Sequence, residues 1–218
     1  MDLSLKGMRA LVCGSSQGIG KEIAIELANE GVEVLLIARN EEKLNSVLNE
    51  LSKKNNQNHR YIVADFENES DLKNKIEKFT SDNKIKIDIL INNSGGPPPG
   101  KITDAKISDF EKYMKMHLHC SHLLTQLFLP NMKKNRYGRI INIISISVKS
   151  PINNLGVSNT VRWAMASWAK TLSNEVAEYG ITVNNILPGF TITERLRSLK
   201  IIPLKLKKLI LNKLKKII

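Results

Sequence analysis

A glycine-rich stretch between two apolar segments is the part of the sequence most able to bind a ligand. Residues 13–20 read Cys-Gly-Ser-Ser-Gln-Gly-Ile-Gly. An apolar run at 9–13 precedes them and apolar residues at helical spacing follow, which indicates a strand, a tight turn and a helix. Glycines let backbone N–H groups approach an anion, and a helix N-terminus carries partial positive charge. The stretch therefore predicts a site for the pyrophosphate of a dinucleotide.

Each glycine of this loop has a physical task. Gly14 would permit the tight turn, Gly18 the approach of backbone to phosphate, and Gly20 the close packing of helix on strand. The spacing is G-x-x-x-G-x-G, so the prediction depends on the strand-to-helix context, and a glycine-rich turn that binds nothing is the alternative. The residues assigned to cofactor binding here are consecutive: Gly14, Ser15, Ser16, Gln17, Gly18, Ile19 and Gly20.

Strand and helix patterns alternate along the rest of the chain. The predicted strands are residues 9–13, 32–38, 60–64, 87–91, 139–144 and 182–187. The predicted later helices are residues 41–54, 69–80, about 104–134 and about 154–179. This alternation predicts an α/β fold, a Rossmann-type doubly wound parallel sheet in the order 3-2-1-4-5-6 with helices on both faces. Both glycine-rich stretches, 14–20 and 94–100, would then meet the ligand crevice at the carboxyl ends of strands 1 and 4.

Charge and length bound the organisation of the chain. At 218 residues and 42% hydrophobic content, one α/β domain over 1–194 is expected, followed by a Lys/Ile/Leu-rich tail at 195–218. Residues 1–194 hold 24 Lys and Arg against 21 Asp and Glu, a net charge of +3, whereas the tail holds nine and no acid, a net charge of +9. The domain offers no basic stripe, which argues against a nucleic-acid partner.

The cysteines and the apolar runs predict the compartment. Cys13 and Cys120 provide no disulfide framework, so a reducing cytoplasm is expected. The N-terminal segment lacks the apolar run of a signal peptide, and no run approaches the length of a membrane span. We therefore expect a soluble cytoplasmic protein.

Five motifs occur in a fixed order at the ends of the predicted strands. They are the loop 14–20, Asp65, Asn92-Asn-Ser-Gly95, Ser145 and Pro188-Gly-Phe-Thr-Ile-Thr193. With them the chain resembles the short-chain dehydrogenase/reductase family over nearly all of residues 5–194. The resemblance implies an oxidoreductase that transfers hydride between a nicotinamide cofactor and a carbonyl or alcohol substrate, in the manner of a 3-oxoacyl reductase.

The resemblance also implies roles for single residues at the strand ends. Asp65 would contact the adenine, and Asn92 would support the strand and the cofactor. Ser94 and Gly95 would belong to the same cofactor-binding set. Pro188 and Gly189 would line the nicotinamide end of the site.

Arg39 stands at the end of the second predicted strand, nineteen positions after Gly20. An acidic residue there would accept the ribose hydroxyls of NAD, whereas an arginine can pair bidentately with a 2′-phosphate. We therefore predict NADP as the cofactor, with NAD possible. The alternative is a surface arginine paired with Glu41 or Glu42.

The residues predicted to line the catalytic site depart from the pattern of the family they resemble. That pattern has a serine, a Tyr-x-x-x-Lys pair on one helix turn and an asparagine in the preceding helix. Ser145 keeps the serine, but Ser158, Arg162 and His117 occupy the other positions. A serine hydroxyl is far less acidic than a phenol with a pKa near 10, and arginine does not deprotonate. His117 is either a substitute acid or an ordinary helix histidine.

Two functions follow from this altered site. One is a divergent NADP-dependent oxidoreductase with Ser145, Ser158, Arg162 and His117 at its site; the other is a dinucleotide-binding protein of the same fold that no longer catalyses. A metal site is not expected: His117, His119, Cys120 and His122 are close in sequence, but residues 117 and 119 would point about 200° apart on a helix.

The tail does not continue the family pattern, which usually adds a helix and a last strand with an Asp-Gly-Gly turn. It is either a basic amphipathic helix that meets an anionic membrane surface, or a truncated or frame-shifted end. We favour the second, because Lys and Ile also dominate earlier segments. Without a seventh strand, residues 182–187 would form a sheet edge with unpaired backbone groups, which favours either association into a homo-oligomer or instability.

Overall fold

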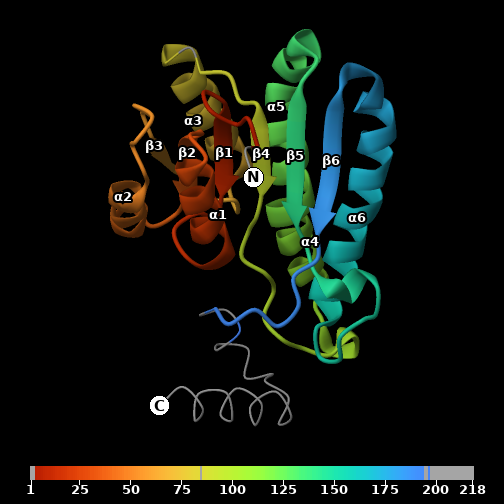
Figure 1. The fold of residues 1–218 in the computed structure, drawn as a ribbon. Helices are drawn as coiled ribbons and strands as arrows, with labels where there is room; N and C mark the ends of the chain where they lie inside the picture. Colours follow the sequence, from red (N-terminus) through yellow and green to blue (C-terminus); the bar gives the residue numbers. More distant parts are fainter. Residues whose placement is uncertain (1–2, 84, 194–195, 197–218) are drawn as a thin grey trace, which may run out of the picture. The chain divides into compact units, whose positions relative to one another are not determined.

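The alternating apolar segments form one six-stranded parallel sheet in the computed structural model, which describes residues 3–83, 85–193 and 196 (Figure 1). The strand order is β3-β2-β1-β4-β5-β6, which confirms the predicted 3-2-1-4-5-6 order. The strands are β1 (Arg9–Cys13), β2 (Glu33–Ala38), β3 (Arg60–Val63), β4 (Ile89–Asn92), β5 (Gly138–Ile143) and β6 (Ile181–Ile186).

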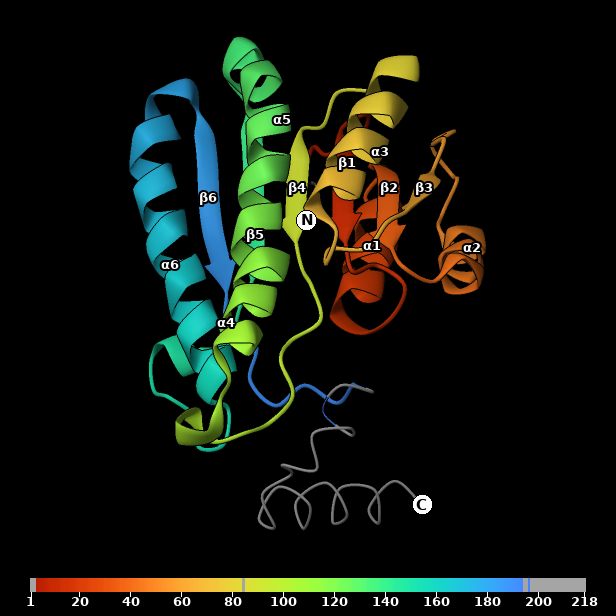
Figure 2. The same cartoon turned by 180° about the vertical axis from the view of Figure 1, so that it is seen from behind.

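Helices cover both faces of the sheet, as Figures 1 and 2 show from opposite sides. The α-helices are α1 (Gly18–Asn29), α2 (Glu41–Glu50), α3 (Glu69–Asp82), α4 (Ile107–Met114), α5 (Cys120–Asn135) and α6 (Gly156–Val176). Short helical turns are η1 (Ile102–Asp104), η2 (Lys115–His119), η3 (Ile146–Val148) and η4 (Ala177–Tyr179). Right-handed crossovers between parallel strands require this two-sided cover.

The core consists of two apolar layers separated by the sheet. Successive strand residues point to opposite faces, so Leu11 packs with α3, α5 and α6, while Val12 packs with α1 and α2. Both side chains are fully buried. Because both faces of β1 are covered, its sequence is continuously apolar rather than alternating.

The long helix predicted over about 104–134 is divided into several parts. Lys106 is extended, and α4 then begins with the side chain of Asp109 accepting a hydrogen bond from the Lys106 N–H at 3.2 Å. The π-helical turn η2 separates α4 from α5. The hydrogen bond from Lys106 to Asp109 explains why a new helix begins at α4, and the extra residue of the π-helical turn explains the break before α5. Apolar periodicity gives no signal for either feature. Other predicted helix and strand ends differ from the observed ones by a few residues.

The chain divides into two units, Met1–Pro188 and Gly189–Ile218, and each is described by itself. The predicted domain boundary was placed between residues 194 and 195. Of the predicted tail, the structure describes only Leu196. Among the described helices, none is both long and apolar enough to cross a membrane.

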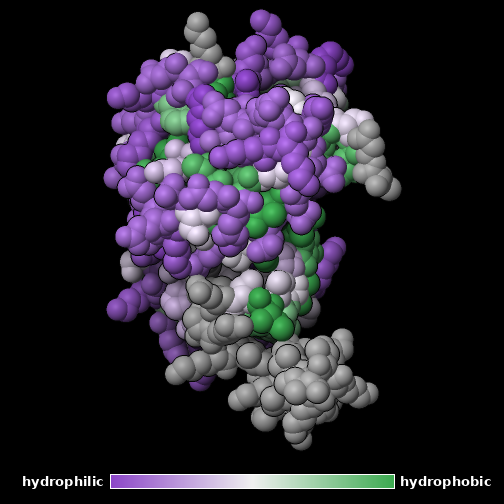
Figure 3. All heavy atoms as spheres, turned by 60° about the vertical axis from the view of Figure 1, so that its left-hand side comes forward, coloured by the Kyte–Doolittle hydropathy of each residue, from purple (hydrophilic) through white to green (hydrophobic). Residues whose placement is uncertain are grey.

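The surface that carries α2 and β3 is largely hydrophilic. Figure 3 brings this side forward and shows polar residues over most of it, with apolar residues visible in the gaps between them. Helix α2 illustrates the reason, because only Leu44 and Val47 of its residues are buried. Spaced three apart, these two residues form the narrow apolar stripe that a surface helix needs.

His59 is a buried imidazole that joins β2 to the segment before β3. The backbone N–H of Val34 donates to Nδ1 at 3.0 Å, so Nε2 carries the proton and donates to the Ser52 carbonyl at 2.7 Å. His59 is therefore neutral in this arrangement, with both ring nitrogens used. Burial lowers its pKa, although the Ser52 hydrogen bond opposes the shift.

Acidification should destabilise the fold through His59. Because the folded-state pKa lies below the unfolded one, the unfolded chain binds the proton first, and the free energy of unfolding falls as the pH drops below about 6.5. Urea unfolding at about pH 7.5 and about pH 5.5 measures this difference. In His59→Gln the difference should shrink, whereas the exposed His122→Gln should retain it. An unchanged difference in His59→Gln would contradict this account.

Candidate active site

The glycines of the loop at 14–20 let its backbone pack against the backbone of Asn93 and against itself at distances that leave no room for a Cβ atom. Gly14 and Gly18 both have φ of +59°, the left-handed region that favours glycine. A Cβ at Gly14 would lie 2.8 Å from the carbonyl oxygen of Asn93, and a Cβ at Gly20 would lie 2.4 Å from the carbonyl oxygen of Gly14. The loop therefore favours glycine at positions 14 and 18 for conformation, and it requires glycine at positions 14 and 20 for space.

The N-terminus of α1 follows directly from this loop. Gln17 precedes the helix without capping it, because its Oε1 instead accepts a hydrogen bond from Lys43 Nζ at 2.7 Å. The first turn contains no acidic residue. Unpaired N–H groups and the helix dipole favour an anion here, and no carboxylate of this turn competes with it.

Two side chains attach the loop to the neighbouring strands. Ser15 Oγ accepts from the N–H of Ile37 at 2.9 Å, which joins the loop to β2. Asn93 Nδ2 donates to the carbonyls of Cys13 and Gly14 at 3.2 and 3.3 Å, which joins it to the end of β4. The sequence pattern does not single out Asn93 as a functional residue, although it lies inside the motif from Asn92 to Gly95.

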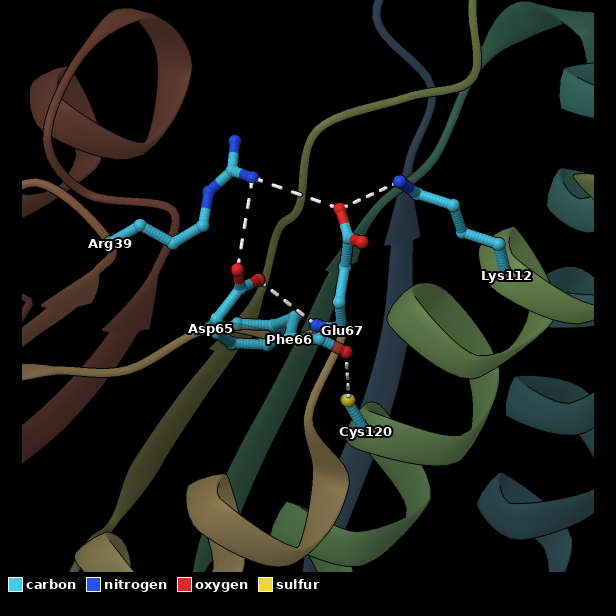
Figure 4. A network of polar contacts seen from close by, with 6 residues as sticks. All are labelled: Arg39, Asp65, Phe66, Glu67, Lys112 and Cys120. Carbon is cyan, nitrogen blue, oxygen red and sulfur yellow. Dashed lines mark hydrogen bonds and ion pairs between the residues drawn. The ribbon is translucent and has the colours of Figure 1, made fainter.

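Arg39 leaves the end of β2 next to the loop and turns toward two carboxylates (Figure 4). Its Nη1 lies 4.0 Å from Asp65 Oδ2 and 3.8 Å from Glu67 Oε1. Within the described part of the chain, Arg39 thus forms ion pairs with Asp65 and Glu67, whereas Glu41 accepts a hydrogen bond from the hydroxyl of Tyr61. At 64% exposure, the Arg39 side chain is accessible to a ligand.

A chain of asparagine side chains joins the ends of three strands. Asn92 Nδ2 donates to Asn142 Oδ1 at 2.8 Å, and Asn142 Nδ2 donates to Asn185 Oδ1 at 2.9 Å. The three residues are register partners across β4, β5 and β6. Asn142 and Asn185 were not predicted, and polar residues within apolar strands were their only sequence signal.

Ser145 and Pro188 lie side by side where β5 and β6 end. Ser145 Oγ accepts from the Ser147 N–H at 3.1 Å, which leaves its own hydrogen for another acceptor. The N–H of Ile146 donates to the Pro188 carbonyl at 3.2 Å. Gly189, the next residue, belongs to the second unit.

Helix α6 brings Ser158 and Arg162 to this edge of the sheet. Arg162 Nη1 donates to the carbonyl of Ile143, the last residue of β5, at 2.8 Å. Ser158 is half-buried and lies one turn earlier on the same helix face. The structure therefore gathers Ser145, Ser158 and Arg162 around the end of β5.

His117 reaches a different part of the same edge. It lies in the π-helical turn η2 and is 3% exposed, and its Nδ1 is 2.7 Å from Ser94 Oγ, two residues after the end of β4. His119, Cys120 and His122 contact Glu69, the Phe66 carbonyl and Trp168 instead. The three histidines and Cys120 thus contact four different partners.

Neither cysteine is suited to act as a nucleophile. Burial raises the pKa of the Cys13 thiol, and the nearby Cys120 raises it further. Burial also raises the pKa of Cys120 to about 12. Both thiols stay protonated near neutral pH, and the thiolate is the reactive form, so chemistry at this edge has to come from the other residues.

The parallel sheet in the order 3-2-1-4-5-6, with a glycine loop opening α1 at the end of β1, defines a Rossmann-type nucleotide-binding fold. A family model described as short chain dehydrogenase matches residues 8–201. The chain belongs to this family.

Relatives and solved structures agree with this assignment. The chain is 36% identical over 190 residues to a 3-oxoacyl-[acyl-carrier-protein] reductase of Rickettsia felis, covering 86% of this chain and 74% of that protein. It is similar to the L-sorbose reductase of Gluconobacter frateurii complexed with NADPH and L-sorbose, with a TM-score of 0.82 at 29% identity over 88% and 73% of the two chains. A 3-ketoacyl-(acyl-carrier-protein) reductase of Brucella melitensis complexed with NADH gives a TM-score of 0.80 at 26% identity over 89% and 80%.

Alanine at position 20 should destabilise the loop. Its Cβ would require the Gly14 carbonyl to move, and overpacking of this kind costs about 1–3 kcal/mol. Urea unfolding followed by circular dichroism measures the free energy of unfolding. The control Gly100→Ala, whose Cβ would meet no atom within 4 Å, should stay within about 0.5 kcal/mol of the wild type. Equal stability of both variants would show that the close approach is not required.

Proposed function

We propose that the chain binds NADP(H), with NAD(H) as a second cofactor, and transfers hydride between it and a carbonyl or alcohol substrate of the 3-oxoacyl kind. The observation that carries the proposal is the glycine loop, held by Ser15 and Asn93 at the carboxyl ends of β1 and β4. The similar proteins with NADPH and NADH bound support the choice of cofactors.

The residues present fit a dinucleotide. Gly14 and Gly20 leave space that a Cβ would fill, and the uncapped N-terminus of α1 suits a pyrophosphate. Arg39 can reach a 2′-phosphate on the adenosine ribose, and Asp65 lies beside it for the adenine. Asn92, Ser94 and Gly95 at the end of β4, with Pro188 after β6, would complete the part of the cofactor site that belongs to the first unit.

Ser145 and Arg162 would act on the substrate oxygen. The nicotinamide ring supplies or accepts the hydride when the cofactor is bound. The Ser145 hydroxyl can donate a hydrogen bond to a carbonyl oxygen, because its own oxygen is already oriented by Ser147. Arg162 supplies a permanent positive charge near the end of β5, which stabilises developing negative charge without moving a proton.

His117 is the residue best able to supply the proton. It is buried behind Ser94, and its Nδ1 and the Ser94 hydroxyl share a hydrogen bond of 2.7 Å. A hydroxyl can accept one proton while it donates another, so Ser94 would relay a proton from the imidazole to the crevice. This route would replace the tyrosine, whose place Ser158 occupies.

A second candidate, a dinucleotide-binding protein without turnover, is favoured by Ser158. Its hydroxyl lacks the acidity of a phenol, and Arg162 already donates to a main-chain carbonyl. Both candidates predict a nucleotide complex, so turnover separates them. In either case we propose a cytoplasmic homo-oligomer without a nucleic-acid partner. The two buried free cysteines support the cytoplasmic location. The position of β6 at the end of the described sheet supports association of copies.

Arg39→Met should weaken the binding of NADPH more than that of NADH. Loss of a charge-assisted contact to the 2′-phosphate should raise the Kd of NADPH about tenfold, with the Kd of NADH little changed. Calorimetric titration of both nucleotides measures this. Arg9→Met is the matched control, because Arg9 pairs with Glu33 at the opposite end of the sheet. Equal losses of affinity for NADPH and NADH would show that Arg39 does not select between the two cofactors.

His117→Gln should slow turnover without affecting cofactor binding. Loss of a general acid costs on the order of 10²-fold in kcat, measured as NADPH oxidation with 3-oxoacyl thioesters and other ketones. His122→Gln, which alters an exposed histidine on α5, should retain the wild-type rate. A wild-type rate in His117→Gln would exclude the proton relay.

The same substrate panel separates the two candidate functions. A variant with Ser158→Tyr and Arg162→Lys carries the Tyr-x-x-x-Lys pair of the family, and it should oxidise NADPH faster than the wild type if hydride geometry is intact. Tight NADPH binding with no turnover by either protein would overturn the oxidoreductase and leave the binding protein.

A further inference from the structure

Four charged side chains from three parts of the fold meet beside the place assigned to the adenosine ribose (Figure 4). Arg39 comes from the end of β2, Asp65 and Glu67 from the loop between β3 and α3, and Lys112 from α4. Two cations face two carboxylates, so the formal charge of this ribose-side cluster is zero. A cluster without net charge does not by itself select for or against a phosphate.

The contacts within the ribose-side cluster are unequal. Glu67 Oε1 lies 2.8 Å from Lys112 Nζ but 3.8 Å from Arg39 Nη1, so one oxygen faces both cations and its closer partner is Lys112. The hydrogen bond to Glu67 also raises the pKa of Lys112, so the ammonium stays charged. Glu67 therefore keeps Lys112 as a partner when Arg39 turns away. The free-energy cost to Arg39 of breaking its own contact with Glu67 is small, because the contact is long and exposed to solvent.

The position of Glu67 is set by its own loop. Its backbone N–H donates to Asp65 Oδ1 at 3.0 Å, which holds the two residues in a local turn. Asp65 Oδ2 remains directed at Arg39, at 4.0 Å. Both carboxylates thus stand where a 2′-phosphate paired with Arg39 would approach them, and like charges repel.

We propose that Glu67 is a specificity-determining residue: it competes with the 2′-phosphate for Arg39 and weakens the preference for NADPH over NADH. Lys112 moderates this effect by neutralising Glu67. The inference rests on the proposed function, because it concerns the nucleotide site proposed above. It also explains how one site with an arginine at position 39 would accept both cofactors.

The test compares Glu67→Gln with the wild-type protein in titrations of NADPH, NADH, 2′,5′-ADP and 5′-AMP. The substitution keeps the shape of the side chain and removes its charge, so the affinity for NADPH and 2′,5′-ADP should rise about threefold to tenfold. The affinities for NADH and 5′-AMP should change less than about twofold, and the gain should decrease with added salt. Lys112→Met should act in the opposite direction and weaken NADPH binding.

Glu69→Gln is the matched control. It removes a carboxylate two residues further along the chain, but that carboxylate pairs with His119 at 2.9 Å. NADPH affinity should stay close to that of the wild type. Equal gains in Glu69→Gln and Glu67→Gln, or equal changes for phosphorylated and unphosphorylated nucleotides, would overturn the inference. Binding of both dinucleotides with no effect of Glu67→Gln would overturn the inference alone, whereas wild-type protein that binds neither dinucleotide would overturn the proposed function as well.

Discussion

The close approach of the Gly14–Gly20 loop to Asn93 is the contact on which the candidate site depends. The chain turns from β1 into α1 through two positions, Gly14 and Gly20, at which no Cβ fits, and the side-chain amide of Asn93 donates to the carbonyls of Cys13 and Gly14. Through Asn93 the loop is joined to β4, and through Ser15 it is joined to β2. The loop therefore holds the carboxyl ends of β1, β2 and β4 together, and with them the side chains that follow these strands.

Hydrogen bonding between strand ends extends this arrangement to the other half of the sheet. The asparagines of β4, β5 and β6 are register partners and hydrogen-bond one another, so the segments that follow these strands begin near the same edge of the sheet. Ser94 and Ser145 each lie two residues after the end of one of these strands, and Arg162 donates to the last carbonyl of β5. Buried polar groups are costly unless they are paired, and here the pairing aligns the edge that carries the candidate chemistry.

The altered residues make a site with two separate regions. Ser145, Ser158 and Arg162 gather at the end of β5, while His117 lies with Ser94 at the end of β4. In the proposed mechanism, the permanent cation of Arg162 and the buried imidazole of His117 would take over the tasks of the family's Tyr-x-x-x-Lys pair. Arg39, Asp65, Glu67 and Lys112 form a separate cluster of balanced charge, so under the proposed function the adenosine half of the nucleotide would be bound by residues that take no part in the chemistry.

The sequence by itself determined the fold, the strand order and the position of the glycine loop. Apolar residues at 3.6-residue spacing and short apolar runs indicate the helices and strands, and right-handed crossovers between them then fix the strand order. The loop is visible as three glycines between a strand and a helix. Through the family resemblance, the sequence also predicts that Ser158 and Arg162 occupy the tyrosine and lysine positions. Only the tertiary structure decided which side chains meet: that Arg39 faces Asp65 and Glu67, that Lys112 holds Glu67, and that His117 bonds Ser94. These partners are 23 or more positions apart in sequence, and their contacts depend on how strands and helices pack, which no local pattern records.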